Sequence, residues 1–293
     1  MTATTATTTL KTASAQRVQV SAKWLVHVAL FCLAVVWLVP SVGLLVTSFR
    51  PQAAIADSGW WMALSPVRFT LDNYRYVLTA QGMGMAFRNS FIITIPSTIL
   101  PLVIASLAAY AFAWVKFWAR DVVFLIIMAL LVVPIQAALV PSLQLTNRLG
   151  LTGSFAGLWI VHTAFGLPFA IYLLRNFFAS IPRELFESAR IDGANDLIIF
   201  ARVVIPLSVP ALASLAIFQF MWVWNDLLMA LVFLNNPDNQ PVTVRMQAML
   251  GTYASDWHIM SASAFISMAV PLIVFFAMQR YFVVGLTAGA VKS

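Results

Sequence analysis

The chain has 293 residues, of which 61% are apolar and only 9% are charged, and its net charge is +7. Soluble globular domains carry about 25% charged residues, because the surface that faces water has to be polar. This composition excludes an ordinary soluble globule and predicts a protein for which the lipid bilayer is the main solvent.

The ends of the chain differ from its middle. Residues 1–22 are rich in Thr and Ala without an apolar period, so we expect a disordered cytoplasmic tail. Residues 23–284 should form one transmembrane domain, because no internal repeat divides them. Residues 285–293 are small and apolar with two glycines, and we expect a second cytoplasmic tail.

Six apolar stretches approach the roughly 20 residues that a helix needs to cross about 30 Å of hydrocarbon. They are residues 24–46, 91–115, 122–140, 156–174, 206–234 and 259–278. We therefore predict an all-α polytopic membrane protein with six transmembrane helices.

The basic residues predict the orientation, because cytoplasmic flanks of membrane proteins retain Lys and Arg. With the N-terminus inside, eleven Lys and Arg residues fall in inner segments and six in outer segments. This favours cytoplasmic termini. The basic residues are dispersed among helix ends and form no single patch, so we expect no nucleic-acid partner.

The segment 48–88, between the first two spans, is too long for a tight turn. Trp60 and Trp61 within it suit the aromatic belt at a membrane surface. We interpret this segment as a lid on the outer face.

Residues 175–202 interrupt the apolar pattern with eight charged residues. Pro182 favours a helix start, Gly193 can adopt the left-handed conformation that ends a helix, and Asn195 can cap a second helix. Alternating start and stop signals predict two short helices that dock onto a partner. The alternative is a solvated loop with helical tendency.

If this loop docks, its short first helix can lie in a groove of a soluble partner. We expect Leu185 and Phe186 to enter that groove, with the small Ser188 and Ala189 allowing close approach. Glu187 would supply a charged contact. Prolines at the base of the fifth span, including Pro206, can then transmit a tilt.

Asp226 is the only acid within an apparent spanning segment. A carboxylate in hydrocarbon is costly, so it should face protein or water. Aromatic rings, amides and carboxylates are also what a sugar pathway uses, so Trp222, Trp224, Asn225 and Asp226 are candidates for a translocation path. Alternatively, Asp226 lies near the outer interface or bonds a neighbouring subunit.

We find no nucleotide-binding, metal-binding or catalytic motif in the sequence. No Gly-x-x-x-x-Gly-Lys-Ser/Thr loop is present, and none of the four lysines follows a glycine, so we predict that the chain is not an ATPase. The single cysteine, Cys32, excludes a disulfide within the chain, and the three histidines are too scattered to suggest a metal site. We expect no catalytic residues and no cofactor in this chain.

Three motifs resemble one protein family. Glu187-Ser188-Ala189, Asp192-Gly193-Ala194 and an apolar run ending at Pro206 resemble the signature loop of ABC importer permeases, with Ser188 where alanine is usual. The intramembrane Trp-Asn-Asp of residues 224–226 and the closing segment 280–293 are similar to the MalG-like, maltose-type branch. This is the branch of carbohydrate importers within the binding-protein-dependent transport inner-membrane component family.

The resemblance implies the type I ABC importer permease fold, with a cytoplasmic coupling loop at residues 180–206. It implies a permease subunit for a carbohydrate, such as an oligosaccharide or α-glucoside, in a bacterial or archaeal inner membrane. The implied protein partners are a second homologous permease, two cytoplasmic ATP-binding subunits and an extracytoplasmic sugar-binding protein, and the implied substrate is the sugar. The ATP-binding subunits would hold ATP and Mg. The segment 48–88 would help to receive the sugar-binding protein.

The resemblance also implies which residues contact the ATPase. In the coupling loop they are Glu187, Ser188, Ala189, Asp192, Gly193, Ala194 and Pro206. In the C-terminal tail they are Gly285, Leu286, Thr287, Ala288 and Gly289, although Val284 replaces a residue that is often polar or basic in the family. Two other classes of function stay open from the residues alone: an ion-coupled secondary carrier, and a membrane scaffold that only recruits a soluble partner.

Overall fold

The computed structural model describes residues 4–252 and 256–288, with side chains described from residue 23 except for residues 251 and 280–288. Every regular element in this part of the chain is a helix, which confirms the predicted all-α class. The chain divides into two compact units, one of residues 1–73 with 256–262 and the other of residues 74–255 with 263–293. The helices α3 (Asp72–Thr79) and α14 (Trp257–Ala288) each continue from one unit into the other.

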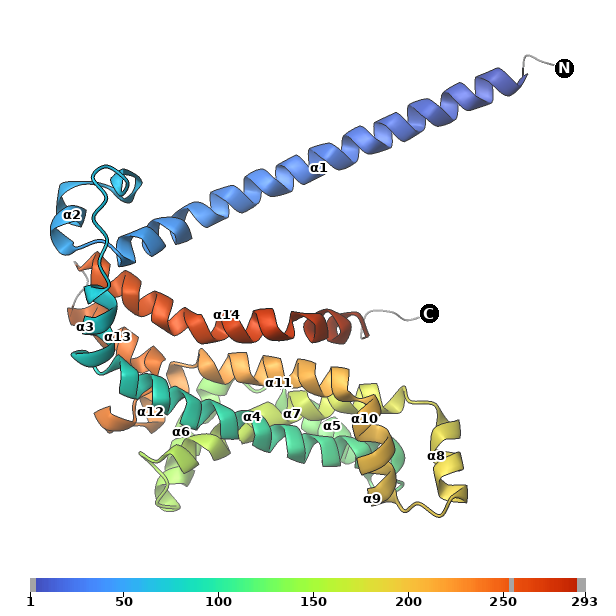
Figure 1. Ribbon diagram of the computed structural model, residues 1–293. Helices are drawn as coiled ribbons and strands as arrows, with labels where there is room; N and C mark the ends of the chain where they lie inside the picture. The colour runs from blue at the N-terminus through green and yellow to red at the C-terminus, as the bar shows by residue number, and fades with distance from the viewer. Residues whose placement is uncertain (1–3, 253–255, 289–293) are drawn as a thin grey trace. The chain divides into compact units, whose positions relative to one another are not determined.

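The first unit is built on α1 (Thr4–Ser48), whose part from Lys23 to Ser48 is long and apolar enough to cross a bilayer (Figure 1). The helix begins at Thr4, inside the segment 1–22 for which the sequence predicted a disordered tail. That segment contains no Pro or Gly. Extending an existing helix avoids the cost of nucleation, so the helix continues where composition alone suggested none.

Arg50 organises the loop that follows this first span. Its buried guanidinium donates hydrogen bonds to the carbonyl oxygen of Ala54 at 2.5 Å and to the carbonyl oxygen of Ser58 at 2.9 Å. Both oxygens belong to the end of α2 (Gln52–Asp57), so the cation lies at the negative end of a helix dipole. The 3-10 helix η1 (Trp60–Met62) follows.

The second unit is centred on the long helices α4 (Met83–Trp114), α7 (Phe155–Ala179) and α11 (Val209–Trp224). α4 packs along α7, and α11 packs against both (Figure 1). The shorter elements of this unit are α5 (Arg120–Leu130), α6 (Ile135–Arg148), α8 (Arg183–Ile191), α9 (Asp196–Ile199), the π-helix η2 (Phe200–Val204), α10 (Ile205–Leu207), α12 (Leu228–Phe233), the 3-10 helix η3 (Pro237–Asn239) and α13 (Val242–Thr252).

Close approach between these helices depends on small and polar residues. A Cβ added to Gly166 of α7 would lie 2.8 Å from the side-chain amide of Gln219 in α11, so any side chain there would displace this amide. The same amide donates a hydrogen bond to the carbonyl oxygen of Ser97 in α4 at 3.1 Å. One polar side chain therefore links all three central helices.

Buried apolar residues form two clusters, one at each end of the three-helix group. The first joins the C-terminal halves of α4 and α7 to the loop that follows, and it includes Tyr110, Leu174, Phe178, Phe186 and Ile199. The second joins their N-terminal halves to α12 and α13, and it includes Ile93, Leu158, Val223, Phe233 and Val244.

The third predicted span, residues 122–140, is not one helix. α5 and α6 form a pair bent by 103°. Pro134 precedes α6, and proline disfavours the helical conformation for the residue before it, so the chain turns where the apolar run continues.

The fifth predicted span, residues 206–234, is also broken. The helical stretch that ends at Leu207 meets α11 at 76°, and a second interruption at residues 225–227 separates α11 from α12. Pro206 and Pro210 lack the N–H groups that would continue the hydrogen-bond ladder through the first break.

Four helices in the described part of the chain are individually long and apolar enough to span a membrane, and the two bent pairs raise the number to six if each pair crosses once. The prediction of six spans therefore holds only when bent pairs are counted as spans.

Candidate functional site

The coupling-loop segment 180–206 folds locally as the sequence predicted. α8 starts after Pro182, and the chain turns at Gly193, whose φ is +81°. Asn195 caps α9 by accepting a hydrogen bond from the amide of Ile198 at 2.9 Å. No heavy atom lies within 4 Å of the place that a Cβ on Gly193 would take, so the backbone conformation, not crowding, favours glycine.

The two short helices of this loop expose large apolar side chains. Leu185 is 42% exposed, Ile191 is 86% exposed and Leu197 is 73% exposed. Large apolar side chains exposed in an otherwise charged segment favour an interaction site. We call these three residues the apolar docking face.

Phe186, the neighbour of Leu185 in α8, points in a different direction and is buried. Its ring stacks on Trp114 at the end of α4, with ring centroids 3.8 Å apart and 24° between the planes. The prediction that Leu185 and Phe186 would enter the same groove is wrong for Phe186. Neighbouring residues of a helix do not share a face, and the larger ring packs inward.

The residues predicted to contact an ATPase occupy different environments. Glu187, Ser188, Asp192, Gly193 and Pro206 are exposed, whereas Ala189 and Ala194 are half-buried. The amide of Ala194 donates to the carbonyl oxygen of Ala189 at 2.9 Å and so closes the turn that follows α8.

Asp196 provides a second connection between the loop and α4. Its Oδ1 accepts hydrogen bonds from the Tyr110 hydroxyl at 3.3 Å and from Arg190 Nη2 at 3.1 Å. The ion pair is exposed, so it adds little by itself. Tyr110 and Trp114 are one turn apart, and together they hold α8 and α9 against the same end of α4.

Between this loop and α11 the chain changes direction. The π-helix η2 leads into α10, and the bend of 76° follows at Ser208, which is buried. Short π-helical segments and prolines are recognised causes of bends in helices. α11 is therefore joined to the loop by a bent segment.

Asp226 caps α12. Its carboxylate accepts hydrogen bonds from the amides of Met229 at 3.3 Å and Ala230 at 3.0 Å, and its side chain is only 11% exposed. The first amides of a helix have no partner within the helix, so a carboxylate at this position stabilises the helix start. The hydroxyl of Thr243 also donates to the carbonyl oxygen of Asp226 at 2.6 Å.

The other three candidates for a translocation path, Trp222, Trp224 and Asn225, differ in accessibility. Trp224 is buried and packs edge-on against Phe87 and Phe91. Trp222 is half-buried and Asn225 is exposed. Of the four candidates for a translocation path, Asn225 is the most exposed, and Trp224 is buried.

His162 is a neighbour of this turn that sequence reasoning missed. It is buried in α7, its Nε2 lies 3.7 Å from Asp226 Oδ2, and its ring meets that of Trp222 edge-on at 5.2 Å. A lone histidine in an apolar span carries no sequence signal that points to a partner.

The C-terminal residues predicted to contact an ATPase lie at the limit of the described chain. The backbone of residues 285–288 forms the end of α14, and residues 289–293 lie outside the described residues. No side chain beyond residue 279 is described. The predicted contact stays a prediction.

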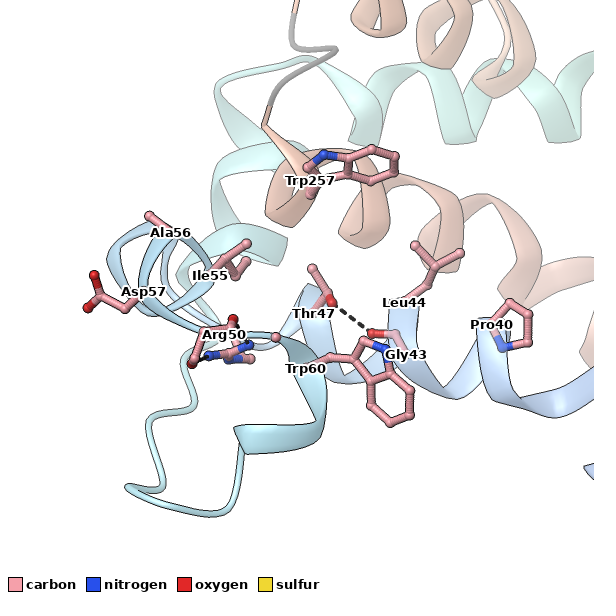
Figure 2. A pocket seen from close by; sticks show the side chains of 12 residues that line it. Pro40, Gly43, Leu44, Thr47, Arg50, Ile55, Ala56, Asp57, Trp60 and Trp257 are labelled. Atoms are coloured by element: carbon pink, nitrogen blue, oxygen red, sulfur yellow. Dashed lines mark hydrogen bonds between the residues drawn. The ribbon is translucent and has the colours of Figure 1, made fainter. Parts of the chain in front are cut away.

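The first unit contains a pocket of about 630 Å³ beside the end of α1 (Figure 2). Trp60 and Trp257 contribute indole rings to its lining, together with Leu44 and Thr47. A Cβ on Gly43 would lie 2.8 Å from Trp60 Nε1. The pocket therefore depends on this glycine, which lets the indole lie against the bare backbone of the helix.

Comparison with known proteins identifies the family. Residues 101–287 match the family described as "binding-protein-dependent transport system inner membrane component". The chain belongs to this family. It is therefore a membrane-embedded permease component of a transport system, which agrees with the resemblance in the coupling loop.

Two relatives of the permease share about half of its residues. The "osmoprotective compounds uptake permease protein GgtD" of Synechocystis sp. is 49% identical over 273 residues, which cover 92% of each chain. The "alpha-glucoside transport system permease protein AglG" of Rhizobium meliloti is 51% identical over 254 residues, which cover 85% of this chain and 67% of the relative.

Solved structures show the same fold. A permease chain of a bacterial ABC transporter involved in the import of alginate superposes with a TM-score of 0.61 and 16% identity, covering 90% of this chain and 96% of the other. This likeness confirms the predicted importer permease fold.

Proposed function

We propose that this permease forms half of the translocation pathway of an ATP-driven importer for a carbohydrate, an oligosaccharide or an α-glucoside. The names of its relatives support this substrate class, since they include an alpha-glucoside permease and an arabinooligosaccharides permease that is 32% identical. The relative named for osmoprotective compounds widens the candidate substrates beyond oligosaccharides.

The observation that carries the coupling role is the apolar docking face on α8 and α9. Leu185, Ile191 and Leu197 point away from the permease core while Phe186 points into it. A short amphipathic helix with this division fits a hydrophobic groove on a soluble partner. Glu187 lies exposed on the same helix and would set the electrostatic match at the rim of that groove.

Motion of the docked loop would pass first to α4. Phe186 on Trp114 and Asp196 on Tyr110 hold the loop to the end of that helix. α7 packs along α4 and would follow it. The bend at Ser208 then lets α11 change its angle to the other two helices, which is how rigid elements commonly rearrange about a hinge.

The proposed assembly contains a second homologous permease, two ATP-binding subunits and an extracytoplasmic sugar-binding protein. ATP and Mg would be bound by the ATP-binding subunits, because this sequence has no phosphate-binding loop. We place both termini and the segment 180–206 in the cytoplasm of a bacterial or archaeal cell. Residues 285–289 would add a second contact to the ATPase, and Trp222, Asn225 and the turn at Asp226 would face the sugar path.

Uptake by the assembled complex in proteoliposomes tests this function. Labelled sugar should accumulate only with ATP, the binding protein and an active ATPase, and collapsing ion gradients with ionophores should change nothing. The control is the same complex with a catalytically inactive ATPase. Uptake driven by an ion gradient without the ATPase would instead identify a carrier, and recruitment of the ATPase without any uptake would identify a scaffold.

A further inference from the structure

A small cavity lies where α4, α7 and the turn between α11 and α12 meet. Its volume is about 10 Å³, and its polar lining consists of Ser90, Thr94, His162 and Asp226. A cavity of about 10 to 15 Å³ measured with a water-sized sphere holds one water molecule when two to four polar groups line it. Both conditions are met here.

Two of these side chains carry buried polar atoms that lack a hydrogen-bond partner in the described part of the chain. They are both ring nitrogens of His162 and the hydroxyl of Thr94, and both residues are almost completely buried. Unpaired buried polar atoms are uncommon in native proteins, and each calls for an explanation. Their presence on one cavity points to a shared polar ligand.

The distance between His162 Nε2 and Asp226 Oδ2 is 3.7 Å. This is too long for a direct hydrogen bond, and a polar gap of this size is commonly bridged by water. A cation fits less well, because the carboxylate already faces the amides of Met229 and Ala230. The two carboxylate oxygens offer about four lone-pair sites. The amides of Leu228, Met229 and Ala230 use at most three of them, so one more donor can bind.

We propose that this cavity binds one water molecule, which bridges His162 Nε2, Asp226 Oδ2 and the hydroxyl of Thr94. The neutral imidazole donates its Nε2 proton to the water, and the water donates to the carboxylate. His162 thereby acts as a positioning residue for the end of α11, which carries Trp222, and for the turn after it, which carries Asn225. The bridge joins α4, α7 and the start of α12 at one point.

A thermal double-mutant cycle on the purified transporter complex tests the water site directly. Thr94→Val removes one partner of the water, and His162→Phe removes another. We expect Thr94→Val alone to lower Tm by about 2 to 4 °C, as loss of one hydrogen bond does in a domain of this size. The double variant should be no less stable than His162→Phe, because the bridge is already lost.

Two further variants control this cycle. Thr98→Val makes the same change one turn further along α4, where the hydroxyl bonds only to the carbonyl oxygen of Thr94, and it should change Tm less than Thr94→Val. His162→Gln keeps an N–H donor close to the place of Nε2 and should restore most of the Tm that His162→Phe loses. An unchanged Tm in Thr94→Val, or additive losses in the double variant, would overturn the bridging water.

The positioning role rests on the proposed transport function and needs a separate measurement. Uptake per assembled complex should fall at least threefold at saturating sugar and binding protein in His162→Phe, and His162→Gln should recover it. Unchanged uptake per complex in His162→Phe would overturn the positioning role while leaving the water site in place. If the wild-type complex shows no uptake at all, the proposed function fails, and the Tm cycle still tests the cavity.

Discussion

Replacing Gly193 by valine should uncouple this permease from its ATPase. The residue has a φ of +81°, and nothing lies within 4 Å of the place a Cβ would occupy. A side chain at this position therefore meets no steric clash, but it makes the left-handed backbone conformation less favourable by about 1 to 2 kcal/mol. Such a cost changes the ratio of two conformations by about 5- to 30-fold.

If that cost falls on the docked form of the loop, the apparent Kd for the ATP-binding subunit rises by the same factor, about 5- to 30-fold. Binding of the purified ATPase to the permease in nanodiscs measures the Kd, and uptake per ATP hydrolysed measures coupling. Gly193→Asn should stay close to wild type, because asparagine tolerates the left-handed conformation better than valine does.

Gly150 supplies a matched control. It has a φ of +69°, it is also free of neighbours within 4 Å, and it lies between α6 and α7, outside the coupling loop. Gly150→Val carries a similar backbone cost and should leave ATPase binding unchanged. Equal ATPase affinity in Gly193→Val and Gly150→Val would refute the idea that the turn at Gly193 sets the docking geometry.

Three other predictions concern the anchor, the intramembrane turn and the tail. Phe186→Ala should cost about 3 to 5 kcal/mol of local packing and free α8 from α4; limited proteolysis should then cut the loop faster, and an unchanged cleavage rate would contradict the anchor. Asp226→Leu removes the cap of α12, worth about 0.5 to 2 kcal/mol, whereas Asp226→Asn keeps a capping side chain. Uptake should therefore fall more in the leucine variant, and wild-type uptake in both would make Asp226 incidental. Deleting residues 286–293 should leave assembly intact and lower sugar-stimulated ATPase activity together with uptake; unchanged stimulation would leave the tail without a coupling role.

Short-range signals predicted the coupling loop well. Pro182, Gly193 and Asn195 act on the backbone within a few residues of themselves, so their effect can be read from the chain alone. Hydropathy did not predict where a span is broken. A hydropathy average counts apolar residues and contains no information about the direction of the helix axis. The runs 122–140 and 206–234 are predominantly apolar, yet the chain bends within both of them next to prolines.

Contacts between distant residues could not be predicted from one sequence. Phe186 and Trp114 meet only because α8 folds back on α4, and no spacing rule connects positions that far apart. His162 and Asp226 are likewise brought together by the packing of α7 against α11 and α12. Asp226 is unusual in the sequence because a carboxylate in hydrocarbon is costly. The backbone amides that donate to its carboxylate belong to α12, which lies inside the longer predicted span 206–234.

The apolar docking face also has a consequence for how much of this protein a cell keeps. Before the ATP-binding subunit arrives, Ile191 and Leu197 remain in water. Exposed apolar surface of this kind promotes aggregation and leads to triage by chaperones and proteases. On the proposed coupling role, this surface would be covered in the assembled transporter and exposed in unassembled permease. Permease made in excess of its soluble partner should be degraded, so the supply of the ATPase would set the number of transporters in the membrane.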